Sequence, residues 1–289
     1  MLAYRHAFHA GNHADVLKHP VLVRVLRYLA LKDKPFTLVD THAGAGGYSL
    51  EGRYANKRAE YADGIARLWA ADDAAKLPPA LADYVSLVRR FNGGGALEQY
   101  PGSPGFASLL LRPQDRLRLF ELHPTDHRIL AAFLAQRPNT QVLPSDGFAA
   151  IRSELPPPQA ARRALLLVDP SYEIKSDYAK VVAALREALS RFAEGVVMIW
   201  YPQLRTVESV QLPHRLQTAA DALAKKGWLH VRLTVRQADE RGFGLVGSGV
   251  FVANPPHVLH GELEPLMQPL VDLLGQYAGA NYLLEQRAA

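Results

Sequence analysis

The most constraining feature of this sequence is a series of short, continuous apolar runs, most of which end at an acidic or polar residue. Continuous apolar runs of about four to eight residues are typical of strands that are buried on both faces, as in a parallel sheet. Helical patterns such as Val21–Leu31 and Tyr178–Leu189 lie between the runs. The alternation predicts a doubly wound α/β sheet. The expected strands are Phe36–Asp40, Leu117–Glu121, Thr140–Asp146, Ala164–Asp169, Val196–Tyr201, Leu229–Val235 and Gly249–Asn254.

The ends of the first four expected strands carry acidic residues. In open α/β sheets, ligands bind in the crevice outside the carboxyl ends of the strands. We therefore expect a ligand site at this edge of the sheet, with carboxylates around it. These strand-end residues are Asp40, Glu121, Asp146 and Asp169.

One segment, residues 51–99, interrupts the alternation of strands and helices. Its apolar residues recur at helical spacing, first in residues 65–69 and again in 81–88, and the Pro78-Pro79 pair separates the two patterns. A chain of 289 residues is long enough for one large α/β core that carries an insertion. The sequence predicts a single domain, residues 1–289, with a helical insertion subdomain at 51–99.

A Gly-rich stretch, DTHAGAGG (Asp40–Gly47), follows the first expected strand. Gly44 and Gly46 allow a tight turn and a close approach of the backbone to a ligand. The stretch lacks the Lys-Ser/Thr of a phosphate-binding P-loop and is shorter than the dinucleotide signature G-x-G-x-x-G. On its own it is equally typical of a plain strand-to-helix turn.

Two acidic residues farther along indicate what this turn would bind. An acidic residue at the position of Glu121 commonly accepts hydrogen bonds from the ribose hydroxyls of an adenosyl ligand. Asp146-Gly147, after the third expected strand, can meet the edge of the adenine. Either acid alone is also typical of a helix N-cap. Their occurrence in order after successive strands favours an adenosyl ligand.

Asp169-Pro170-Ser171-Tyr172 looks like a catalytic Asp-Pro-Pro-Tyr sequence in which one proline is replaced. The Asp169 carboxylate and the Pro170 carbonyl can both accept from an exocyclic adenine amine, which favours the pyramidal, nucleophilic form of that amine. Tyr172 offers a ring for stacking on a base taken out of its helix. Ser171 keeps the backbone carbonyl and removes only the rigidity of the second proline. A plain strand-to-loop turn is the alternative interpretation.

A second candidate, Asn254-Pro255-Pro256, closes the last expected strand. The expected pocket is built from the first four strands, and of the two candidates only Asp169 lies beside it. Proline at a strand end stops the hydrogen-bond ladder. We therefore expect Asn254 to be a structural strand end.

The composition excludes several classes of chemistry. The absence of cysteine excludes disulfides, thiolate zinc sites and cysteine nucleophiles, and it argues against methylation of pyrimidine C5. A net charge of +5 and a pI of about 9.4 favour a polyanionic partner. No apolar run approaches the roughly 18 residues that span a bilayer, and the N-terminus has no apolar signal core. The sequence predicts a soluble, cytoplasmic protein.

The N-terminal stretch YRHAFHAGNHADVLKHP (Tyr4–Pro20) is rich in histidine. His9 and His13 are four residues apart, a spacing that can bring two metal ligands to one helical face. However, H-E-x-x-H is absent and Asp15 is the only nearby carboxylate, so we expect no metal. The histidines are then either a solvated, hydrogen-bonded set or, with Lys18, part of a ligand site.

Together these residues resemble the bacterial RlmJ family, which methylates adenine N6 in 23S ribosomal RNA with S-adenosylmethionine. The resemblance covers nearly the whole chain. The family's usual form of the site sequence is Asp-Pro-Pro-Tyr, so Ser171 departs from it. The stretches that carry the resemblance are YRHAFHAGNHADVLKH, DTHAGAG, YPGSP (Tyr100–Pro104), ELHP (Glu121–Pro124), SDGF (Ser145–Phe148) and DPSY.

The resemblance implies a Rossmann-like class I methyltransferase fold with a small helical insertion, and S-adenosylmethionine as the methyl donor, without a metal. It implies that Asp169 accepts the amine proton, with Pro170 and Tyr172 beside it. Tyr4 and His6 would face the RNA adenosine. The residues that would hold S-adenosylmethionine are Lys18, His19, His42, Gly44, Ser103, Glu121, Asp146 and Gly147.

The expected partner is 23S ribosomal RNA, as free RNA or in an assembly intermediate, and the expected state is a monomer with no membrane association. Three alternatives remain open. The same chemistry serves a DNA adenine-N6 methyltransferase, and only dependence on the substrate 2′-hydroxyl separates the two. Ser171 also allows a non-catalytic RNA-binding protein of this fold. A histidine-liganded metal hydrolase is the third.

Overall fold

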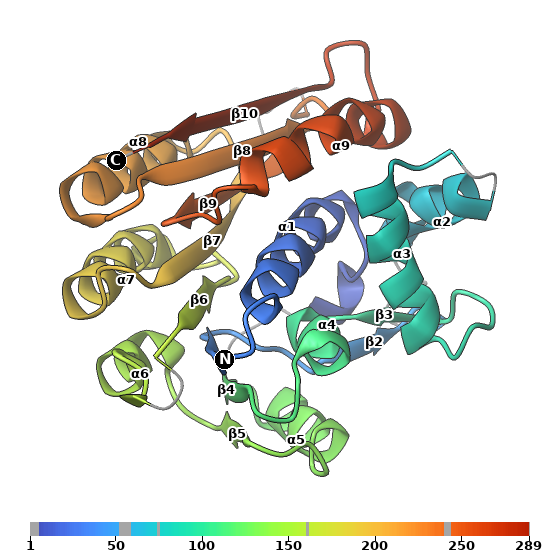
Figure 1. The fold of residues 1–289 in the computed structure, drawn as a ribbon. Helices are drawn as coiled ribbons and strands as arrows, with labels where there is room; N and C mark the ends of the chain where they lie inside the picture. The colour runs from blue at the N-terminus through green and yellow to red at the C-terminus, as the bar shows by residue number, and fades with distance from the viewer. Residues whose placement is uncertain (1–5, 52–58, 74–75, 160–161, 240–243, 289) are drawn as a thin grey trace.

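The computed structural model describes residues 6–51, 59–73, 76–159, 162–239 and 244–288. Strands and helices alternate along much of the chain, as the apolar runs predict (Figure 1). The strands are β1 (Thr37–Asp40), β2 (Gly47–Ser49), β3 (Gln99–Pro101), β4 (Arg116–Phe120), β5 (Thr140–Leu143), β6 (Ala164–Val168), β7 (Val196–Gln203), β8 (Trp228–Thr234), β9 (Gly247–Ala253) and β10 (Asn281–Arg287). The α-helices are α1 (His13–Ala30), α2 (Ile65–Asp73), α3 (Pro79–Phe91), α4 (Ser103–Leu110), α5 (Pro124–Phe133), α6 (Gly147–Glu154), α7 (Ser176–Arg191), α8 (Val207–Leu223) and α9 (Leu259–Leu274).

The central sheet has the strand order β10-β8-β9-β7-β6-β1-β4-β5. Strands β5, β4, β1, β6 and β7 run parallel, whereas β9, β8 and β10 are antiparallel to their neighbours. The chain passes from β1 outward to β4 and β5, and then returns to the other side of β1 with β6. The order therefore changes direction between β1 and β6, the place where doubly wound sheets bind ligands. The predicted Rossmann-like α/β fold is confirmed.

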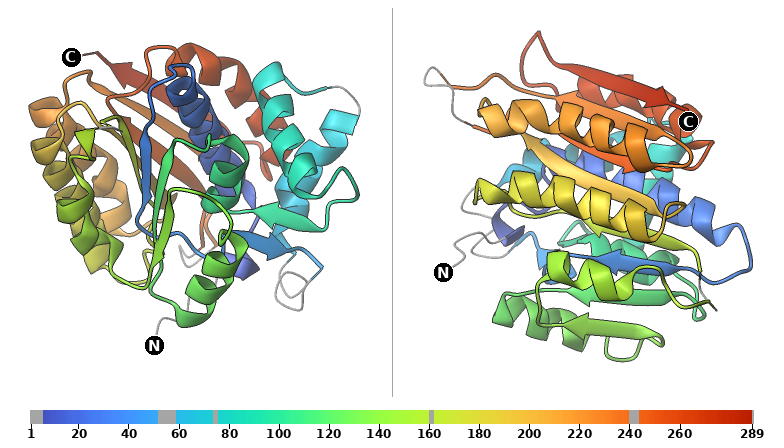
Figure 2. Two further views of the ribbon diagram at one scale, coloured as in Figure 1. Left: turned by 60° about the horizontal axis from the view of Figure 1, so that its bottom comes forward. Right: turned by 90° about the vertical axis from the view of Figure 1, so that its left-hand side faces the viewer.

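Helices cover both faces of the sheet because successive side chains of each strand point to opposite sides. Leu38 of β1 belongs to the core that includes residues of α1, α4 and α9. Its neighbour Val39 belongs to the core that includes residues of α6, α7 and α8. Figure 2 shows these two helical layers on either side of the sheet. Burial on both faces explains why the apolar runs are continuous rather than alternating.

The first helix differs from the sequence expectation. It begins at His13 rather than at Val21, and its first turns contain the buried side chains of Asp15 and Lys18. Because these residues are polar, a hydrophobic periodicity does not include them. The Asn12 side chain caps the helix by accepting hydrogen bonds from two backbone N–H groups. The N-terminal polar stretch is thus part of the folded core.

Two strands also differ. Strand β5 ends at Leu143 because Pro144 has no N–H to continue the ladder, and Asp146 is instead the N-cap of α6. Strand β10 was not expected. It pairs antiparallel with β8 at the edge of the sheet, and its side chains are exposed or half-buried. Its mixed sequence, NYLLEQR, lacks the continuous apolar character of the inner strands.

Residues 51–99 contain α2 and α3, as their helical spacing predicts. A short antiparallel ribbon flanks the segment, with Tyr48 of β2 opposite Tyr100 of β3. The two helices contact each other, and both contact α9. The interpretation of this segment as an insertion subdomain within one domain stays a prediction.

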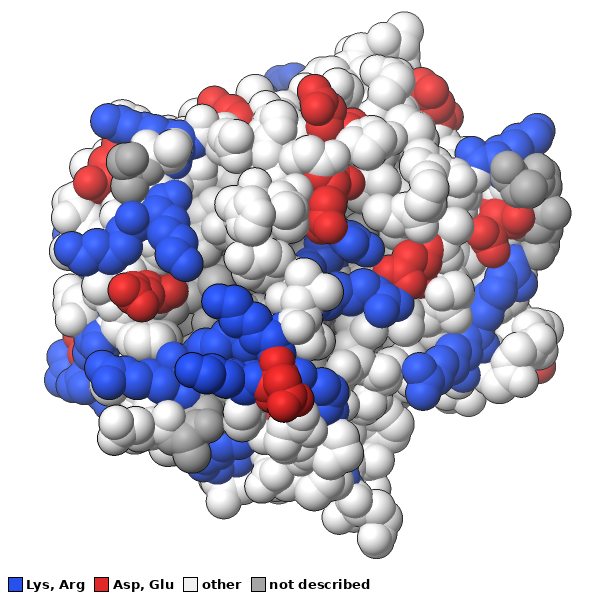
Figure 3. All heavy atoms as spheres, in the orientation of Figure 1, with Lys and Arg blue, Asp and Glu red and all other residues white. Residues whose placement is uncertain are grey.

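The surface carries the excess positive charge unevenly. Figure 3 shows Lys and Arg side chains gathered over the lower left of one face. A groove at the first residues of β6 and β7 is lined by the basic residues Lys32, Arg162, Arg163, Lys226 and Arg287.

Among the helices of the described residues, none has the length and apolar character needed to cross a membrane.

Candidate active site

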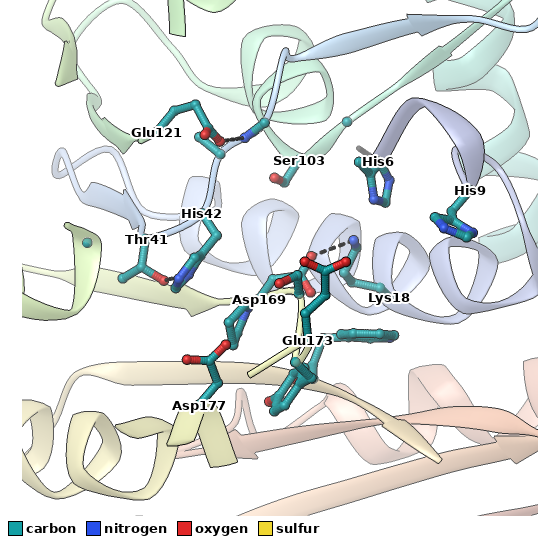
Figure 4. Close-up of a pocket in the computed structure, with 18 of the residues that line it drawn as sticks. His6, His9, Lys18, Thr41, His42, Ser103, Glu121, Asp169, Glu173 and Asp177 are labelled. Atoms are coloured by element: carbon teal, nitrogen blue, oxygen red, sulfur yellow. Dashed lines mark hydrogen bonds and ion pairs between the residues drawn. The ribbon is translucent and has the colours of Figure 1, made fainter. Parts of the chain in front are cut away.

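A cavity of about 490 Å³ lies at the carboxyl ends of β1, β4 and β6, where the strand order changes direction. The first turns of α1 also contribute to its wall (Figure 4). Every predicted site residue that the structure describes lines this cavity. They are His6, Lys18, His19, His42, Gly44, Ser103, Glu121, Asp146, Gly147, Asp169, Pro170 and Tyr172. The remaining predicted residue, Tyr4, lies outside the described residues.

Asp169 is held on one side by a buried lysine. The Nζ atom of Lys18 lies 2.6 Å from Oδ2 of Asp169 and 2.9 Å from Oδ1 of Asp15. Burial lowers the pKa of Lys18, but the carboxylates of Asp15 and Asp169 more than offset this effect and raise the pKa above its usual value. Within the described residues, the other oxygen of Asp169, Oδ1, has no hydrogen-bond partner. One oxygen is therefore occupied and the other remains for a ligand.

The chain turns sharply after Asp169. Tyr172 has a φ of +55°, in the left-handed region that aromatic residues rarely adopt. Its hydroxyl donates a 2.7 Å hydrogen bond to the carbonyl oxygen of Trp200, and its ring centroid lies 4.7 Å from that of Tyr178. These contacts hold a conformation that costs about 1–3 kcal/mol, and such strain is concentrated at functional sites.

The turn after β1 is tied to the end of β4. The Gly44 N–H donates to Oε2 of Glu121 at 2.8 Å, and the His123 N–H donates to Oε1 at 2.6 Å. Gly44 has a φ of +64°, and a Cβ there would lie 2.2 Å from Oη of Tyr48, so the turn requires glycine. Burial raises the pKa of Glu121. Each carboxylate oxygen keeps a further lone pair for a ligand.

Helix α6 approaches the end of β1 closely. A Cβ at Gly147 would lie 2.1 Å from the carbonyl oxygen of Thr41. Asp146 caps this helix, because its Oδ1 accepts a hydrogen bond from the Phe148 N–H at 2.9 Å. The N-cap interpretation is therefore confirmed for this oxygen. The His42 ring lies 4.8 Å from the Phe148 ring. Burial lowers the pKa of His42 to about 4, so this imidazole is neutral at pH 7.

His19 is fully buried and is hydrogen-bonded on one side only. Its Nδ1 lies 2.6 Å from Oη of Tyr100, which lies 2.8 Å from Oη of Tyr84. In the part of the chain that the structure describes, Nε2 has no partner. Burial holds the pKa of His19 well below its usual value, so the ring is neutral. A buried polar atom without a partner beside a cavity indicates a ligand contact.

Ser103 is the first residue of α4, and it joins that helix to the end of β1. Its hydroxyl donates a 2.6 Å hydrogen bond to Oδ2 of Asp40, and the His42 N–H donates to Oδ1 at 3.1 Å. Burial raises the pKa of Asp40 to about 6, although these two hydrogen bonds act in the opposite direction. Gly102 and Ser103, at the N-terminal end of α4, line the cavity, and helix N-termini favour anions.

The N-terminal histidines have separate partners. Nε2 of His6 lies 2.9 Å from Oδ2 of Asp15, and Nδ1 of His9 lies 2.9 Å from Oε2 of Glu60. His9 precedes α1 whereas His13 begins it, so the two do not share a helical face. Nowhere in the described ranges do three or more His, Asp or Glu side chains gather in a way that could hold a metal ion.

Asp15 and Trp200 are among the cavity residues that the sequence reasoning did not assign to the site. Asp15 was considered only as a metal ligand, yet it contacts both His6 and Lys18. Its i,i+3 spacing from Lys18 was an available signal, since such pairs meet on one helical face. Trp200 lies in β7 and lines the cavity beside Tyr172, and nothing in its local sequence indicates this.

The second proline-containing candidate lies at the opposite edge of the sheet. Strand β9 runs antiparallel to β7, with Ala253 opposite Val197, so Asn254 falls at the amino ends of the parallel strands. The Asn254 amide donates to the carbonyl oxygens of Ala193 and Gly195, both at 2.8 Å. The prediction of a structural strand end is confirmed.

The chain is similar to several known proteins. A family model described as "Ribosomal RNA large subunit methyltransferase D, RlmJ" matches residues 33–284. A protein of Escherichia coli named ribosomal RNA large subunit methyltransferase J is 43% identical over 267 residues, which are 92% of each chain. A Haemophilus influenzae protein of the same name is 43% identical over 287 residues, 99% of this chain and 98% of the relative. A crystal structure of a Legionella pneumophila protein has 33% identity and a TM-score of 0.85, and the match covers 96% of this chain and 98% of the other.

Proposed function

The chain belongs to the RlmJ family of ribosomal RNA large subunit methyltransferases, and from this premise we propose that it transfers a methyl group from S-adenosylmethionine to the N6 amine of an adenosine in 23S ribosomal RNA. The strand order supports this proposal, because the cavity lies where doubly wound sheets bind adenosyl ligands. The cytoplasm is the proposed place of action, since the RNA partner is there.

The observation that carries the proposal is the arrangement of Asp169 in this cavity. Lys18 holds Oδ2, and Oδ1 remains for the target amine. The carbonyl of Pro170 supplies a second acceptor next to it. An exocyclic amine donates both of its N–H groups to such a pair, which directs the nitrogen lone pair out of the plane of the base. Asp169 then accepts the proton that the nitrogen loses after it gains the methyl group.

The residues present fit S-adenosylmethionine. The cavity volume of about 490 Å³ falls within the roughly 300–1,000 Å³ of small-molecule sites. We assign the ribose hydroxyls to Glu121 and the adenine edge to Asp146 and Gly147. His42, neutral beside Phe148, belongs to the same adenine side. When bound, S-adenosylmethionine supplies an electrophilic methyl group.

We assign the methionine end of S-adenosylmethionine to the first turns of α1 and α4. The unpartnered Nε2 of His19 and the N-terminus of α4 at Ser103 provide donors for a carboxylate. The Lys18 ammonium has three N–H groups and already contacts two carboxylates, so one donor remains for this purpose. Gly44 lets the backbone of the turn after β1 come close to the bound S-adenosylmethionine.

The target adenosine is assigned to the side of the cavity next to Tyr172. One side of the Tyr172 ring packs against Tyr178, and the residue also lines the cavity, which supports stacking on an extruded base. His6 lies at the same cavity, and it is the proposed RNA contact together with Tyr4. The net charge of +5 suits an RNA partner, bound by a monomer either as free RNA or in an assembly intermediate.

The test is transfer of labelled methyl groups from S-adenosylmethionine to protein-free 23S ribosomal RNA that lacks its modifications. The product RNA is digested and the labelled nucleoside is identified. DNA of matched sequence and the Asp169→Ala protein are assayed in parallel. We expect label in RNA as N6-methyladenosine, and none in DNA or with the variant.

Other outcomes separate the alternatives. Equal label in DNA would contradict RNA specificity, because the 2′-hydroxyl would then have no role. A different labelled nucleoside would contradict the assignment of the amine. If the protein binds S-adenosylmethionine but labels neither nucleic acid nor an assembly intermediate, it is a non-catalytic binding protein.

A further inference from the structure

Asp15 joins the N-terminal segment to the candidate active site. It lies in the first turn of α1 and is 1% exposed. Its Oδ2 accepts the Gly11 N–H at 2.9 Å and lies 2.9 Å from Nε2 of His6. Its Oδ1 lies 2.9 Å from Nζ of Lys18. One oxygen therefore contacts the N-terminal segment and the other contacts Lys18.

Lys18 continues this connection to the end of β6. Its Nζ lies 2.6 Å from Oδ2 of Asp169, and Figure 4 shows this contact on the cavity wall. The order of contacts is thus His6 to Asp15, Asp15 to Lys18, and Lys18 to Asp169. Alternating acidic and basic groups run without a gap from the segment proposed to face RNA to the carboxylate proposed to act on the amine.

The surroundings of Asp15 favour its ionised form. Burial by itself raises the pKa of Asp15, but the nearby His6 and Lys18 more than offset burial and hold the pKa well below its usual value. A buried carboxylate that is ionised must be matched by donors on both oxygens, as observed here. The same donors would be unsatisfied if Asp15 were replaced by an apolar residue.

We propose that Asp15 is a positioning residue for methyl transfer, which acts by fixing the Lys18 ammonium so that it contacts Asp169 through Oδ2 alone. The proposal rests on the function proposed above. Asp15 also holds His6 and Gly11, so the placement of the N-terminal segment and of Asp169 depends on one carboxylate.

The physical reason lies in the geometry of an ammonium group. Lys18 carries three N–H donors on a flexible stem. With Asp15 in place, the nitrogen is anchored between two carboxylates and approaches Asp169 from one side. Without the charge of Asp15, the ammonium can move to bridge both oxygens of Asp169. It then occupies Oδ1, the oxygen that the amine needs.

The test is a double-variant cycle with Asp15→Asn, Lys18→Met and the two combined, in the full-length protein. The maximal single-turnover rate is measured with S-adenosylmethionine and unmodified 23S ribosomal RNA, together with the RNA concentration dependence. We expect Asp15→Asn to lower the maximal rate at least about tenfold. The combined variant should be no slower than Lys18→Met, because Asp15 acts through Lys18.

Asp83→Asn is the matched control. Asp83 pairs with Arg24 and Arg27 of α1, the helix that also carries Asp15, but it does not line the cavity. This control should keep the wild-type maximal rate even if it lowers the unfolding temperature. If Asp15→Asn and Asp83→Asn instead lose stability and rate in parallel, then Asp15 has only a structural role and the proposal fails.

The remaining outcomes are also decisive. Rate losses that add in the combined variant, or a wild-type rate in Asp15→Asn, would overturn the proposal. If Asp15→Asn does not fold, Asp15→Glu carries the test, since it keeps the charge but displaces the ammonium. Its rate should fall while it stays folded, and an unchanged rate would count against positioning. A wild-type protein with no transfer at all would instead reject the proposed function.

Discussion

The hydroxyl of Ser103 donates a 2.6 Å hydrogen bond to Oδ2 of Asp40, which links the start of α4 to the end of β1 inside the protein. Asp40 is fully buried, and burial raises its pKa from 3.8 to about 6. As the pH rises from about 4 to 6, the unfolded chain releases this proton before the folded protein does. Ionisation of Asp40 therefore lowers the free energy of unfolding, by something of the order of 3 kcal/mol once the pH exceeds 6.

Asp40→Asn should remove this pH dependence. Relative to the wild type, the free energy of unfolding of the variant should increase between pH 4 and pH 7, because only the wild type ionises at this position. Urea unfolding of both proteins at several pH values measures the difference, and contributions from other groups cancel in it. A difference that is the same at pH 4 and pH 7 would show that the pKa of Asp40 is not raised.

Asp169→Asn should lower the rate of methyl transfer by about 100-fold to 10,000-fold, because the amide cannot accept the amine proton. Binding of S-adenosylmethionine should stay measurable by calorimetry. The asparagine variant is preferable to alanine for stability, since its side-chain oxygen can still accept a hydrogen bond from the buried Lys18 ammonium, which Asp15 continues to pair with. Asp221→Asn, which changes a carboxylate paired with Arg287 outside the cavity, is the control and should retain the full rate.

Ser171→Pro should keep or raise the rate of transfer. The carbonyl groups of the turn are unchanged, and a proline ring restricts φ in the sequence that precedes the strained Tyr172. Steady-state kinetics with RNA as the varied substrate measure the effect. A loss of more than about tenfold, roughly 1.4 kcal/mol of barrier, would mean that the cavity has adapted to serine.

Gly44→Ala should weaken binding of S-adenosylmethionine by about tenfold or more, because the new Cβ would meet Oη of Tyr48 at 2.2 Å. Adding Tyr48→Phe removes that oxygen and should recover part of the affinity. Gly93→Ala is the matched control: Gly93 has the same φ of +64°, but a Cβ there would meet no atom of the described residues within 4 Å. Calorimetry on the four proteins separates the clash from the backbone strain. Equal losses in Gly44→Ala and Gly93→Ala would count against the assigned close approach.

The inner strands of the sheet were predictable because burial on both faces leaves a signal within each short stretch of sequence. Strands buried on both faces must be continuously apolar, and a parallel sheet brings their carboxyl ends together, so Glu121 and Asp169 could be placed at one site. The edge strand β10 could not be predicted in this way, because a half-exposed strand has no such requirement.

The burial of the first turns of α1 could not be predicted, although the i,i+3 spacing of Asp15 and Lys18 indicated that these two side chains meet. Asp15 and Lys18 are almost completely buried, yet polar residues are read from sequence as exposed. Their burial is possible only because each finds a charged partner, and the partner Asp169 is 151 positions away from Lys18 along the chain. A local pattern contains no information about such a pairing.

The antiparallel direction of β9 has a practical consequence for experiments. It sends the loops near Asn254 to the edge of the sheet that faces away from the cavity. Lys225 is exposed in this region, and the chain contains no cysteine. A single cysteine introduced at Lys225 would therefore accept one fluorophore, at a known position and away from the reacting groups. Association with long RNA molecules can then be followed optically without a change to any residue that lines the cavity.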